Sequence, residues 1–522
     1  MGGLTVVLTV LSFPPFETPE FAYAFAAPAI FWAYLRPRWR LYAWTMLGAQ
    51  ALAWTILLGW LHHATWLGLC LLGPFMGAWV GLWYLAVRWL VPRMQGRQTG
   101  LRIAAMFGLA GLWVLLEWTR TWFLGGFPWL PLAASQWQRA ILLQIASYTG
   151  AGGISFILIT FNLGFAAYAH RLFREREVGL RRRSPEFMAA LMVLIFPSFL
   201  LMREIFNQQR REVARLALVQ PYIPQNIKWD PARGPGILEV LENSTLAAAA
   251  THSDLIVWPE AVTPWAVKGD EAMREWVESL VARAGAPLLF GSIAVENRGT
   301  PEETWANRAF IAYPQGGLDS DTYTKRHLVP FGEYVPLRPL LGWLEKIVPV
   351  GGDFQPGTEE NLLAVSLQRE LVAIAPLICY EDTYPALVRT SVLAGADVLA
   401  VLTNNGWFGE GGAAYQHAAH SVLRAVETRR PVVRCGNGGW SGWIDEYGRI
   451  RAVLTNDEDS IYFRGIRAVN LSRDRRWVGR ESFYVAHGDW FLIVCFVLLG
   501  LGVGAVTVGR APTENTEEPA QK

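Results

Sequence analysis

The sequence predicts a protein in two parts: a polytopic α-helical membrane domain of about eight spans and an α/β domain outside the cytoplasm. Composition is the first observation, because 52% of the 522 residues are hydrophobic and only 17% are charged, below the roughly 25% typical of soluble domains. Long uncharged runs fill the N-terminal part and return near the C-terminus, and ordinary globular sequence lies between them. A net charge of +2 gives no electrostatic argument for a nucleic-acid partner.

Eight apolar segments approach the roughly 20 residues that a helix needs to cross a bilayer. The first is residues 1–16, where a cleaved signal peptide is not favoured, because a basic leading region and a cleavage site before Pro14-Pro15 are missing. The fifth contains Glu117 and Arg120, which mark either a functional site or an ion pair near the end of a span. The segments after the first are residues 21–35, 41–61, 66–87, 103–123, 150–169, 187–202 and 490–508.

Arginine divides the loops between these segments into two kinds. Residues 36–40, 88–102 and 171–183 carry several arginines each, whereas residues 14–20 and 62–65 carry no lysine or arginine. Because basic loops stay in the cytoplasm, we expect the globular part on the opposite side of the membrane. The expected division is a membrane domain of about seven spans at 1–210, the globular domain at 211–480, a membrane helix at 488–509 and a disordered cytoplasmic tail at 510–522.

The globular part alternates strand and helix patterns. Short runs rich in valine and isoleucine at 216–219, 255–257, 287–293, 371–378 and 398–402 predict strands, and residues 272–283 and 417–428 predict helices between them. This alternation predicts an α/β domain. Because the strand runs are apolar throughout, the sheets should be buried on both faces.

Cys379 is the first candidate for chemistry. It ends the apolar run at 371–378 and is followed by Glu381 and Asp382. A thiol at the end of a strand, beside acids, can be held rigidly and activated by a base. The same cysteine could instead be a small hydrophobic residue buried in the core, or it could form a disulfide with Cys435.

Two further strings supply a base and a cation. Glu260 follows the apolar run 255–257 at a predicted strand end, where a carboxylate is well placed for proton transfer. Lys325 lies between Glu260 and Cys379 in the sequence, and by itself it could be an ordinary surface lysine.

These strings resemble the nitrilase superfamily, whose chemistry uses a Glu-Lys-Cys triad, and more closely its membrane-bound apolipoprotein N-acyltransferase branch. One string, from Arg434 to Trp440, departs from the family pattern. The matching strings are Val219-Gln220, Ile223-Pro224-Gln225-Asn226, Lys228-Trp229, His327 to Tyr334, Thr403 to Gly409, Glu117 with Arg120, and Gly126-Phe127-Pro128-Trp129.

The resemblance implies a fold and an activity. The implied fold is a helical domain in the bacterial inner membrane joined to a four-layer αββα sandwich, which is the catalytic domain and lies in the periplasm. The activity is transfer of an acyl chain from a membrane phospholipid, through a Cys379 thioester, to the amine of a diacylglyceryl apolipoprotein. Glu260 would act as base and Lys325 as oxyanion partner, with no metal or organic cofactor. The matched motifs also supply supporting or substrate-binding candidates, namely Glu333, Glu381, Tyr380, Trp229 and Trp407.

Two other functions remain open: a membrane-tethered amidase that hydrolyses a small amide, and a non-catalytic component that binds or transports lipoproteins. Three local interpretations accompany them. Glu333 and Glu381 either polarise the site or pair with Lys325 or an arginine. His417 and His420 have a spacing that could suit a metal, but without a third ligand cluster a helix surface is favoured. Residues 337–350 form either a core helix or one that dips into the membrane interface.

Overall fold

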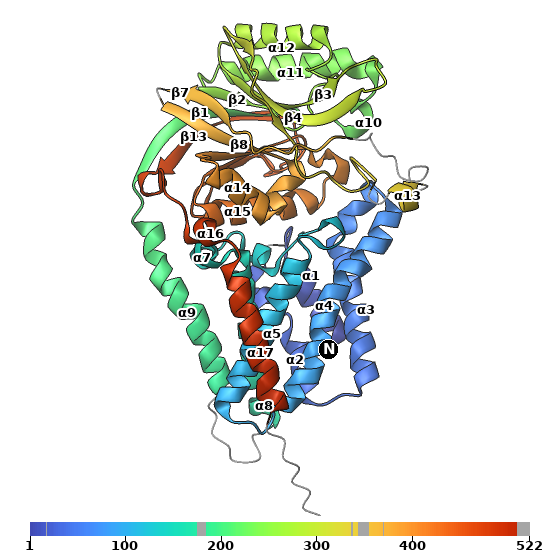
Figure 1. Ribbon diagram of the computed structural model, residues 1–522, viewed down its shortest axis with the longest axis vertical. Helices are drawn as coiled ribbons and strands as arrows, with labels where there is room; N and C mark the ends of the chain where they lie inside the picture. The colour runs from blue at the N-terminus through green and yellow to red at the C-terminus, as the bar shows by residue number, and fades with distance from the viewer. Residues whose placement is uncertain (17, 175–183, 336–337, 343–353, 369, 509–522) are drawn as a thin grey trace, which may run out of the picture.

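The computed structural model describes residues 1–16, 18–174, 184–335, 338–342, 354–368 and 370–508 (Figure 1). A helical region forms one end of the molecule and an α/β region the other, and α9 and α17 connect the two. The tail expected at 510–522 and most of residues 337–350 lie outside the described residues. Within the latter, α13 (Arg338–Leu341) is a single short helical turn.

Among the residues that the structure describes, five helices are long and apolar enough to cross a membrane. A further helix, α3 (Trp39–Leu57), has 19 residues but includes Arg40 and Gln50. The first two expected spans are shorter than predicted, because α1 (Gly2–Leu11) has 10 residues and α2 (Ala27–Tyr34) has 8. The five long helices are α4 (Trp66–Met94), α5 (Thr99–Thr119), α8 (Ala151–Arg174), α9 (Pro185–Phe206) and α17 (Trp490–Thr507).

Helix α17 returns to the N-terminal bundle and packs against α5 through glycines. A Cβ placed on Gly108 would lie 2.9 Å from the Cα of Gly502, and one on Gly111 would lie 2.8 Å from the carbonyl oxygen of Cys495. Helices in lipid associate through close contacts of this kind, because the hydrophobic effect does not drive them together there. The last helix therefore belongs to the same bundle as the first ones.

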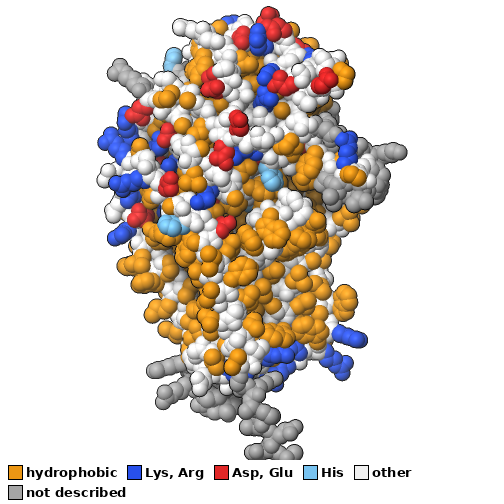
Figure 2. All heavy atoms as spheres, in the orientation of Figure 1, with side chains coloured by type: hydrophobic (Ala, Val, Ile, Leu, Met, Phe, Trp, Pro, Cys, Tyr) orange, Lys and Arg blue, Asp and Glu red, His pale blue; other side chains and the backbone are white. Residues whose placement is uncertain are grey.

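The surface agrees with a membrane setting. Figure 2 shows hydrophobic side chains covering the sides of the helical region, with lysine and arginine at its far end. Large side chains such as Trp44, Leu71, Phe199 and Ile493 are more than half exposed there. A soluble protein rarely exposes so large an apolar area.

Two sheets form the core of the α/β region. The first has seven strands in the order β13-β1-β2-β3-β4-β5, with β6 beside β4, and the second has six in the order β12-β11-β10-β9-β8-β7. The first sheet comprises β1 (Arg210–Gln220), β2 (Leu255–Val257), β3 (Leu288–Glu296), β4 (Thr304–Tyr313), β5 (Gly317–Leu318), β6 (Tyr323–Thr324) and β13 (Gly465–Asp474). The second comprises β7 (Leu363–Leu367), β8 (Glu370–Ile378), β9 (Val398–Thr403), β10 (Val432–Gly436), β11 (Gly442–Ile444) and β12 (Ile450–Val453).

Every strand predicted from a valine- and isoleucine-rich run is present, and the sheets are buried on both faces. One hydrophobic cluster joins them, since it contains Leu218 and Leu289 of the first sheet with Ile374 and Leu402 of the second. Helices α11 (Gly234–Ala249) and α12 (Glu271–Ala284) cover the outer face of the first sheet, and α14 (Pro385–Leu393) and α15 (Ala413–Thr428) lie between the second sheet and the helical region (Figure 1).

Candidate active site

Three chain segments that follow strands bring the candidate residues together. Glu260 follows β2, Lys325 follows β6 directly, and Cys379 follows β8. The carboxylate oxygen Oε1 of Glu260 lies 3.3 Å from the Nζ of Lys325. Cys379 lies beside them, because its sulfur accepts a 3.3 Å hydrogen bond from the Thr403 hydroxyl and the next residue, Asn404, donates its backbone N–H to Glu260 at 3.0 Å. The structure therefore places all three predicted triad residues in one site.

Cys379 occupies a sharp turn. Its φ is +54°, in the left-handed region, and it begins the 3-10 turn η8 (Cys379–Thr383). A residue with a side chain is strained in this conformation unless its surroundings hold it there. The strain is consistent with a site residue whose position is set by the neighbouring packing.

Glu381 holds this turn in place. It is fully buried and accepts hydrogen bonds from the backbone N–H groups of Ile378 (2.7 Å), Arg326 (2.7 Å) and His327 (3.1 Å). The Tyr323 hydroxyl donates to it as well, at 2.9 Å. Burial raises the pKa of Glu381. Among the described residues, its hydrogen-bond partners are thus the Tyr323 hydroxyl and the backbone of the cysteine turn and of the lysine segment. Pairing with Lys325 or an arginine side chain, one of the two roles considered for it, is not seen there.

Lys325 bridges two carboxylates. Its Nζ lies 2.8 Å from Oε1 of Glu333 and 3.3 Å from Oε1 of Glu260, and only 1% of its side chain is exposed. Burial lowers the pKa of Lys325, but Glu333 and Glu260 outweigh this and raise it above the ordinary value. Glu333 therefore pairs with Lys325, which is one of the two roles proposed for it.

Glu260 is an ionised carboxylate in these surroundings. Asn307 donates to its Oε1 at 2.9 Å and the backbone N–H of Asn404 donates to its Oε2 at 3.0 Å. Burial raises its pKa, but the charges of Lys325 and Lys228 and these hydrogen bonds outweigh burial, so the pKa lies below its usual value. The carboxylate can accept a proton at neutral pH.

The thiol is a protonated group at rest. Burial and the charge of Glu260 raise the pKa of Cys379 to about 12, although Lys325 and a 3.3 Å hydrogen bond from Thr403 oppose the shift. A nucleophile with such a pKa needs a base at the moment of attack. Glu260 is the carboxylate whose charge acts on the thiol.

A second buried network lies beneath the turn, and the sequence did not predict it. Asp382 is fully buried and contacts Arg434 (2.9 Å), His417 (2.8 Å) and the Ser421 hydroxyl (2.6 Å). Burial raises the pKa of Asp382, but His417 and Arg434 with their hydrogen bonds outweigh it, so the pKa lies below its usual value. The sequence showed only that Asp382 follows Glu381 directly, and this did not identify Arg434, His417 or Ser421 as the partners of Asp382.

His417 connects this network to the cysteine. Its Nε2 lies 2.8 Å from Asp382 and 3.1 Å from the carbonyl oxygen of Cys379, and its Nδ1 faces the Asn405 amide nitrogen at 3.3 Å. Burial and Arg434 lower the pKa of His417, so the neutral ring carries its proton on Nε2 and donates to both oxygens. The expectation of a helix surface is wrong, since His417 and His420 are 2% and 1% exposed. A third ligand is lacking too: the described residues hold no cluster of three metal-ligating side chains.

The loop at 126–132 of the helical region meets the cysteine turn from below. The Tyr380 hydroxyl donates to the carbonyl oxygen of Gly126 at 3.2 Å, and the Tyr380 ring stacks on Phe127 at 6.0 Å. Trp129 lies 5.5 Å from the ring of His417 and donates to Gln416 at 2.8 Å. Tyr380 is therefore a contact between the two regions.

The two remaining candidates are exposed tryptophans. Trp229 and Trp407 are 48% and 45% exposed, so neither fills the interior of the site. Lys228, which was not singled out from the sequence, is buried; burial lowers its pKa to about 8, and the charges of Glu260 and Cys379 oppose this shift. Cys435 is a free thiol beside the carbonyl oxygens of Val219 and Val257, so the disulfide with Cys379 is absent.

Comparison with known proteins finds matches to both regions of the chain. Residues 215–476 match the family described as carbon-nitrogen hydrolase, and residues 6–164 match the apolipoprotein N-acyltransferase N-terminal domain. An apolipoprotein N-acyltransferase from Geobacter metallireducens is 34% identical over 508 residues, 95% of this chain and 92% of the relative. One from Chlorobaculum tepidum is 30% identical over 434 residues, 78% of this chain and 77% of the relative.

Among solved structures, an amidase from Nesterenkonia sp. aligns with a TM-score of 0.39 and 19% identity, over 56% of this chain and 98% of the amidase. The match to the Geobacter protein extends over both regions, and the two family matches cover the helical and the α/β part in turn. The chain belongs to the apolipoprotein N-acyltransferase family, the membrane-bound acyltransferases of the carbon-nitrogen hydrolase type.

Proposed function

We propose that the protein transfers an acyl chain from a membrane phospholipid to the N-terminal amine of a diacylglyceryl apolipoprotein, through a thioester on Cys379. The observation that carries the proposal is the gathering of Cys379, Glu260 and Lys325 in one site: the Glu260 carboxylate is 3.3 Å from the buried Lys325 ammonium, and the adjacent residues Thr403 and Asn404 donate to Cys379 and to Glu260. Covalent catalysis divides the transfer into two easier steps.

In the first step Glu260 removes the thiol proton while Cys379 attacks the ester carbonyl. Lys325 stands next to Glu260 and stabilises the negative oxygen that develops. The C–S bond forms, the C–O bond breaks, and the proton on Glu260 passes to the departing lysophospholipid. In the second step the amine attacks the thioester, Glu260 takes a proton from it, the C–N bond forms, and the thiol leaves with that proton.

The charges in the site suit a reaction away from bulk water. Glu260 and Glu333 both contact the Lys325 ammonium. A Cys379 thiolate would place a third negative charge near that ammonium. We infer that deprotonation coincides with attack, because a free thiolate is disfavoured until the substrate carbonyl accepts its electrons. Lys228 is a second cation near Cys379 and would offset part of this charge.

The architecture supports a lipid substrate and a fixed orientation. We propose that α3 and the five long helices cross the bacterial inner membrane, that the four-layer αββα catalytic domain at 211–480 lies in the periplasm, and that the C-terminal helix at 488–509 is the last passage. Both ends of the catalytic domain connect to helices, and its lower face meets the helical bundle (Figure 1). Both substrates are bilayer-anchored, so a domain held at the bilayer could reach them.

Intact mass of the purified protein after incubation with phospholipid tests the proposal. An acyl adduct should appear on the wild type and be absent from Cys379→Ala, and it should disappear when a diacylglyceryl lipopeptide is added. An adduct formed only from small amides would support an amidase instead, and no adduct would support a binding component.

Reporter fusions test the orientation separately. A fusion after residue 300 should report a periplasmic position, because the basic loops between the spans should remain in the cytoplasm. A cytoplasmic signal there would overturn the orientation and, with it, the lipoprotein substrate.

A further inference from the structure

One turn of helix α15 connects the helical region to the cysteine turn. Gln416 and His417 are adjacent residues of this helix and are only 1% and 2% exposed. Among the described residues, the Gln416 side chain bonds to groups of the helical region, and His417 bonds to the backbone of Cys379. Two neighbouring side chains thus reach both parts of the molecule.

The Gln416 amide binds four groups of the helical region. Its Oε1 accepts from the indole N–H groups of Trp60 (2.9 Å) and Trp129 (2.8 Å). Its Nε2 donates to the carbonyl oxygens of Pro14 (3.1 Å) and Leu57 (3.0 Å). An amide that uses both of its donors and both acceptor positions is fixed in place and orientation. Gln416 therefore sets where α15 lies on the helical region.

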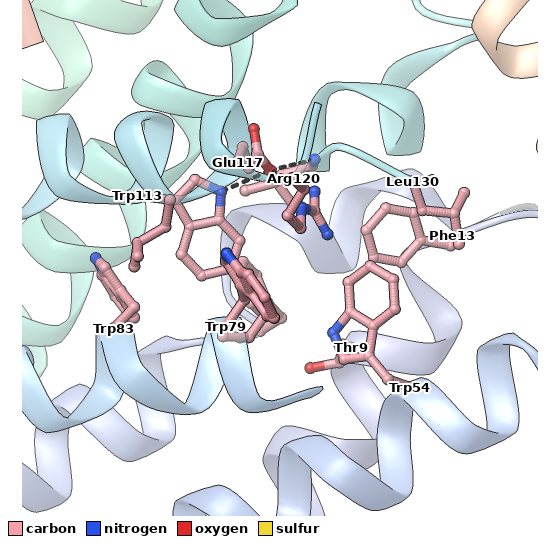
Figure 3. A pocket seen from close by; sticks show the side chains of 13 residues that line it. Thr9, Phe13, Trp54, Trp79, Trp83, Trp113, Glu117, Arg120 and Leu130 are labelled. Carbon is pink, nitrogen blue, oxygen red and sulfur yellow. Dashed lines mark hydrogen bonds and ion pairs between the residues drawn. The ribbon is translucent and has the colours of Figure 1, made fainter. Parts of the chain in front are cut away.

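The loop that carries Trp129 is itself anchored at the end of α5. Oε1 of Glu117 accepts from the indole N–H of Trp113 and from the backbone N–H of Leu132, each at 2.7 Å. Figure 3 shows Glu117 beside Trp113 and Arg120, and its Oε1 lies 3.8 Å from Nη2 of Arg120. The carboxylate of this helix therefore holds the loop in addition to pairing with the arginine.

His417 holds the backbone of the candidate nucleophile. Its Nε2 donates to the carbonyl oxygen of Cys379 at 3.1 Å, and Glu381 accepts from the N–H of Ile378 at 2.7 Å. The chain is thus held on either side of the Cα of Cys379. Because the φ of Cys379 is +54°, the turn keeps its shape only while contacts of this kind restrain it.

We propose that His417 is a positioning residue for Cys379, and that Gln416 fixes His417 relative to the helical region. His417 contacts the carbonyl group of the nucleophile and acts through it. Trp129 contacts both side chains, by its hydrogen bond to Gln416 and by a ring contact with His417 at 5.5 Å. The thiol then has its reacting position only while α15 is seated on the helical region. This role rests on the proposed function of Cys379 as the nucleophile.

Small displacements of a reacting thiol are costly. A shift of about 1 Å can lower a rate about 100-fold, although it changes the folded structure little. Positioning therefore predicts slow chemistry with an unchanged KM for phospholipid. A purely structural role predicts a lower unfolding temperature and an unchanged rate for the protein that remains folded.

The rate of acyl-enzyme formation at saturating phospholipid tests the role of His417. His417→Leu removes the donor and should lower this rate by about 10- to 100-fold. His417→Gln should restore most of the rate, because the glutamine amide nitrogen lies as many bonds from Cα as Nε2 of histidine and can donate to the same oxygens. His420→Leu is the matched control. His420 is 1% exposed and contacts the same Trp129 ring, but its hydrogen bond goes to the backbone N–H of Leu130, so the rate should stay near that of the wild type.

Alkylation of Cys379 by iodoacetamide in a Cys70→Ala background tests the position of the thiol without acyl transfer. Burial and the charge of Glu260 raise the pKa of this thiol to about 12, against the opposing charge of Lys325, so release of the turn in His417→Leu should lower the pKa. The alkylation rate at pH 8 should then rise by about tenfold or more, since each unit of pKa changes the thiolate fraction about tenfold. The control variant should react at the wild-type rate.

A double-mutant cycle tests whether Gln416 acts through His417. Gln416→Leu should slow acyl-enzyme formation. Gln416→Leu/His417→Leu should be no slower than the slower single variant, because the second change then acts on a contact already lost. Gln136→Leu is the control, since Gln136 is also 1% exposed but donates to Pro19 and Ser135 within the helical region, and it should leave the rate unchanged.

Wild-type acylation and alkylation rates in His417→Leu would overturn the positioning role, and so would an equal loss of rate in His420→Leu. Single effects that multiply in the double variant would overturn the link through Gln416. If His417→Leu does not fold, the same two rates in Gln416→Leu decide, and wild-type values there would overturn the proposal. Acyl transfer by Cys379→Ala would overturn the proposed function instead, and the alkylation rates would still report on His417.

Discussion

Asp382→Asn removes the only carboxylate that contacts Arg434 in the described structure and leaves the shape of the side chain unchanged. Both side chains are 0% exposed, and they are 2.9 Å apart. The arginine would keep a 3.0 Å hydrogen bond to the Ser421 hydroxyl but no opposite charge at contact distance. Breaking a buried pair in this way costs about 3–5 kcal/mol, which corresponds to a fall of roughly 10 °C in the unfolding midpoint of the catalytic domain.

Two further variants separate the loss of the buried ion pair from the effect of an Asp→Asn change in general. Asp382→Asn with Arg434→Met removes both charges and should recover part of the loss, because an apolar replacement of a buried pair is tolerated better than a broken pair. Asp270→Asn makes the same chemical change at the start of α12, in a pair with exposed Arg298, and should cost less than about 1 kcal/mol.

Intrinsic fluorescence of the 25 tryptophans follows the unfolding of each variant, and intact mass follows the acyl-enzyme. The pKa of Asp382 is lowered, so its stabilising effect is present above its unfolded-state pKa and is lost only as the pH falls through the lower folded value. A midpoint of Asp382→Asn within about 2 °C of the wild type, or a double variant no more stable than the single one, would refute the proposed role of the network.

The remaining predictions concern the reacting groups. Glu260→Gln should abolish the acyl-enzyme, because the amide cannot accept a proton; wild-type accumulation of the thioester would remove its role as base. Lys325→Met should lower the rate of acyl-enzyme formation by at least about 100-fold, and a rate near that of the wild type would contradict the oxyanion role. Glu381→Gln should slow the same step, since an amide group would face several backbone donors that the carboxylate accepts; unchanged kinetics would contradict its positioning role. In a Cys70→Ala background, alkylation of Cys379 should still rise about tenfold per pH unit between pH 9 and 10, because its pKa is raised to about 12; a plateau near pH 9 would show an ordinary thiol.

The order of elements in the α/β domain could be predicted because its strands carry a strong signal. The valine- and isoleucine-rich runs before Glu260 and Cys379 became β2 and β8. The early helices were predicted less well. An uncharged stretch such as 21–35 is apolar enough for a span, but it divides into a 3-10 turn, η1 (Pro19–Tyr23), and α2 (Ala27–Tyr34). Hydropathy does not distinguish a span from apolar sequence that packs inside a bundle.

The site could be predicted only as far as its motifs extend. Glu260, Lys325 and Cys379 end or follow strands, and a strand end fixes where a side chain is presented. Asp382 and His417 are brought together by the packing of α15 beneath the cysteine turn, over a separation of 35 residues. Nothing in the local pattern around His417 distinguishes a buried hydrogen-bonded ring from one on a helix surface.

The pairing of β1 with β13 has a mechanical consequence. The strand that follows α9 and the strand that precedes α17 are neighbours along their whole length, from Arg210 opposite Asp474 to Gln220 opposite Gly465. The catalytic domain is thus connected to the helical region by α9 and α17, which lead into two paired strands. The 126–132 loop makes a third contact, at Tyr380. Three supports fix the height and tilt of a rigid body. For the proposed phospholipid donor, an ester at a different depth would have to move to the thiol, because the domain itself would not move to meet it.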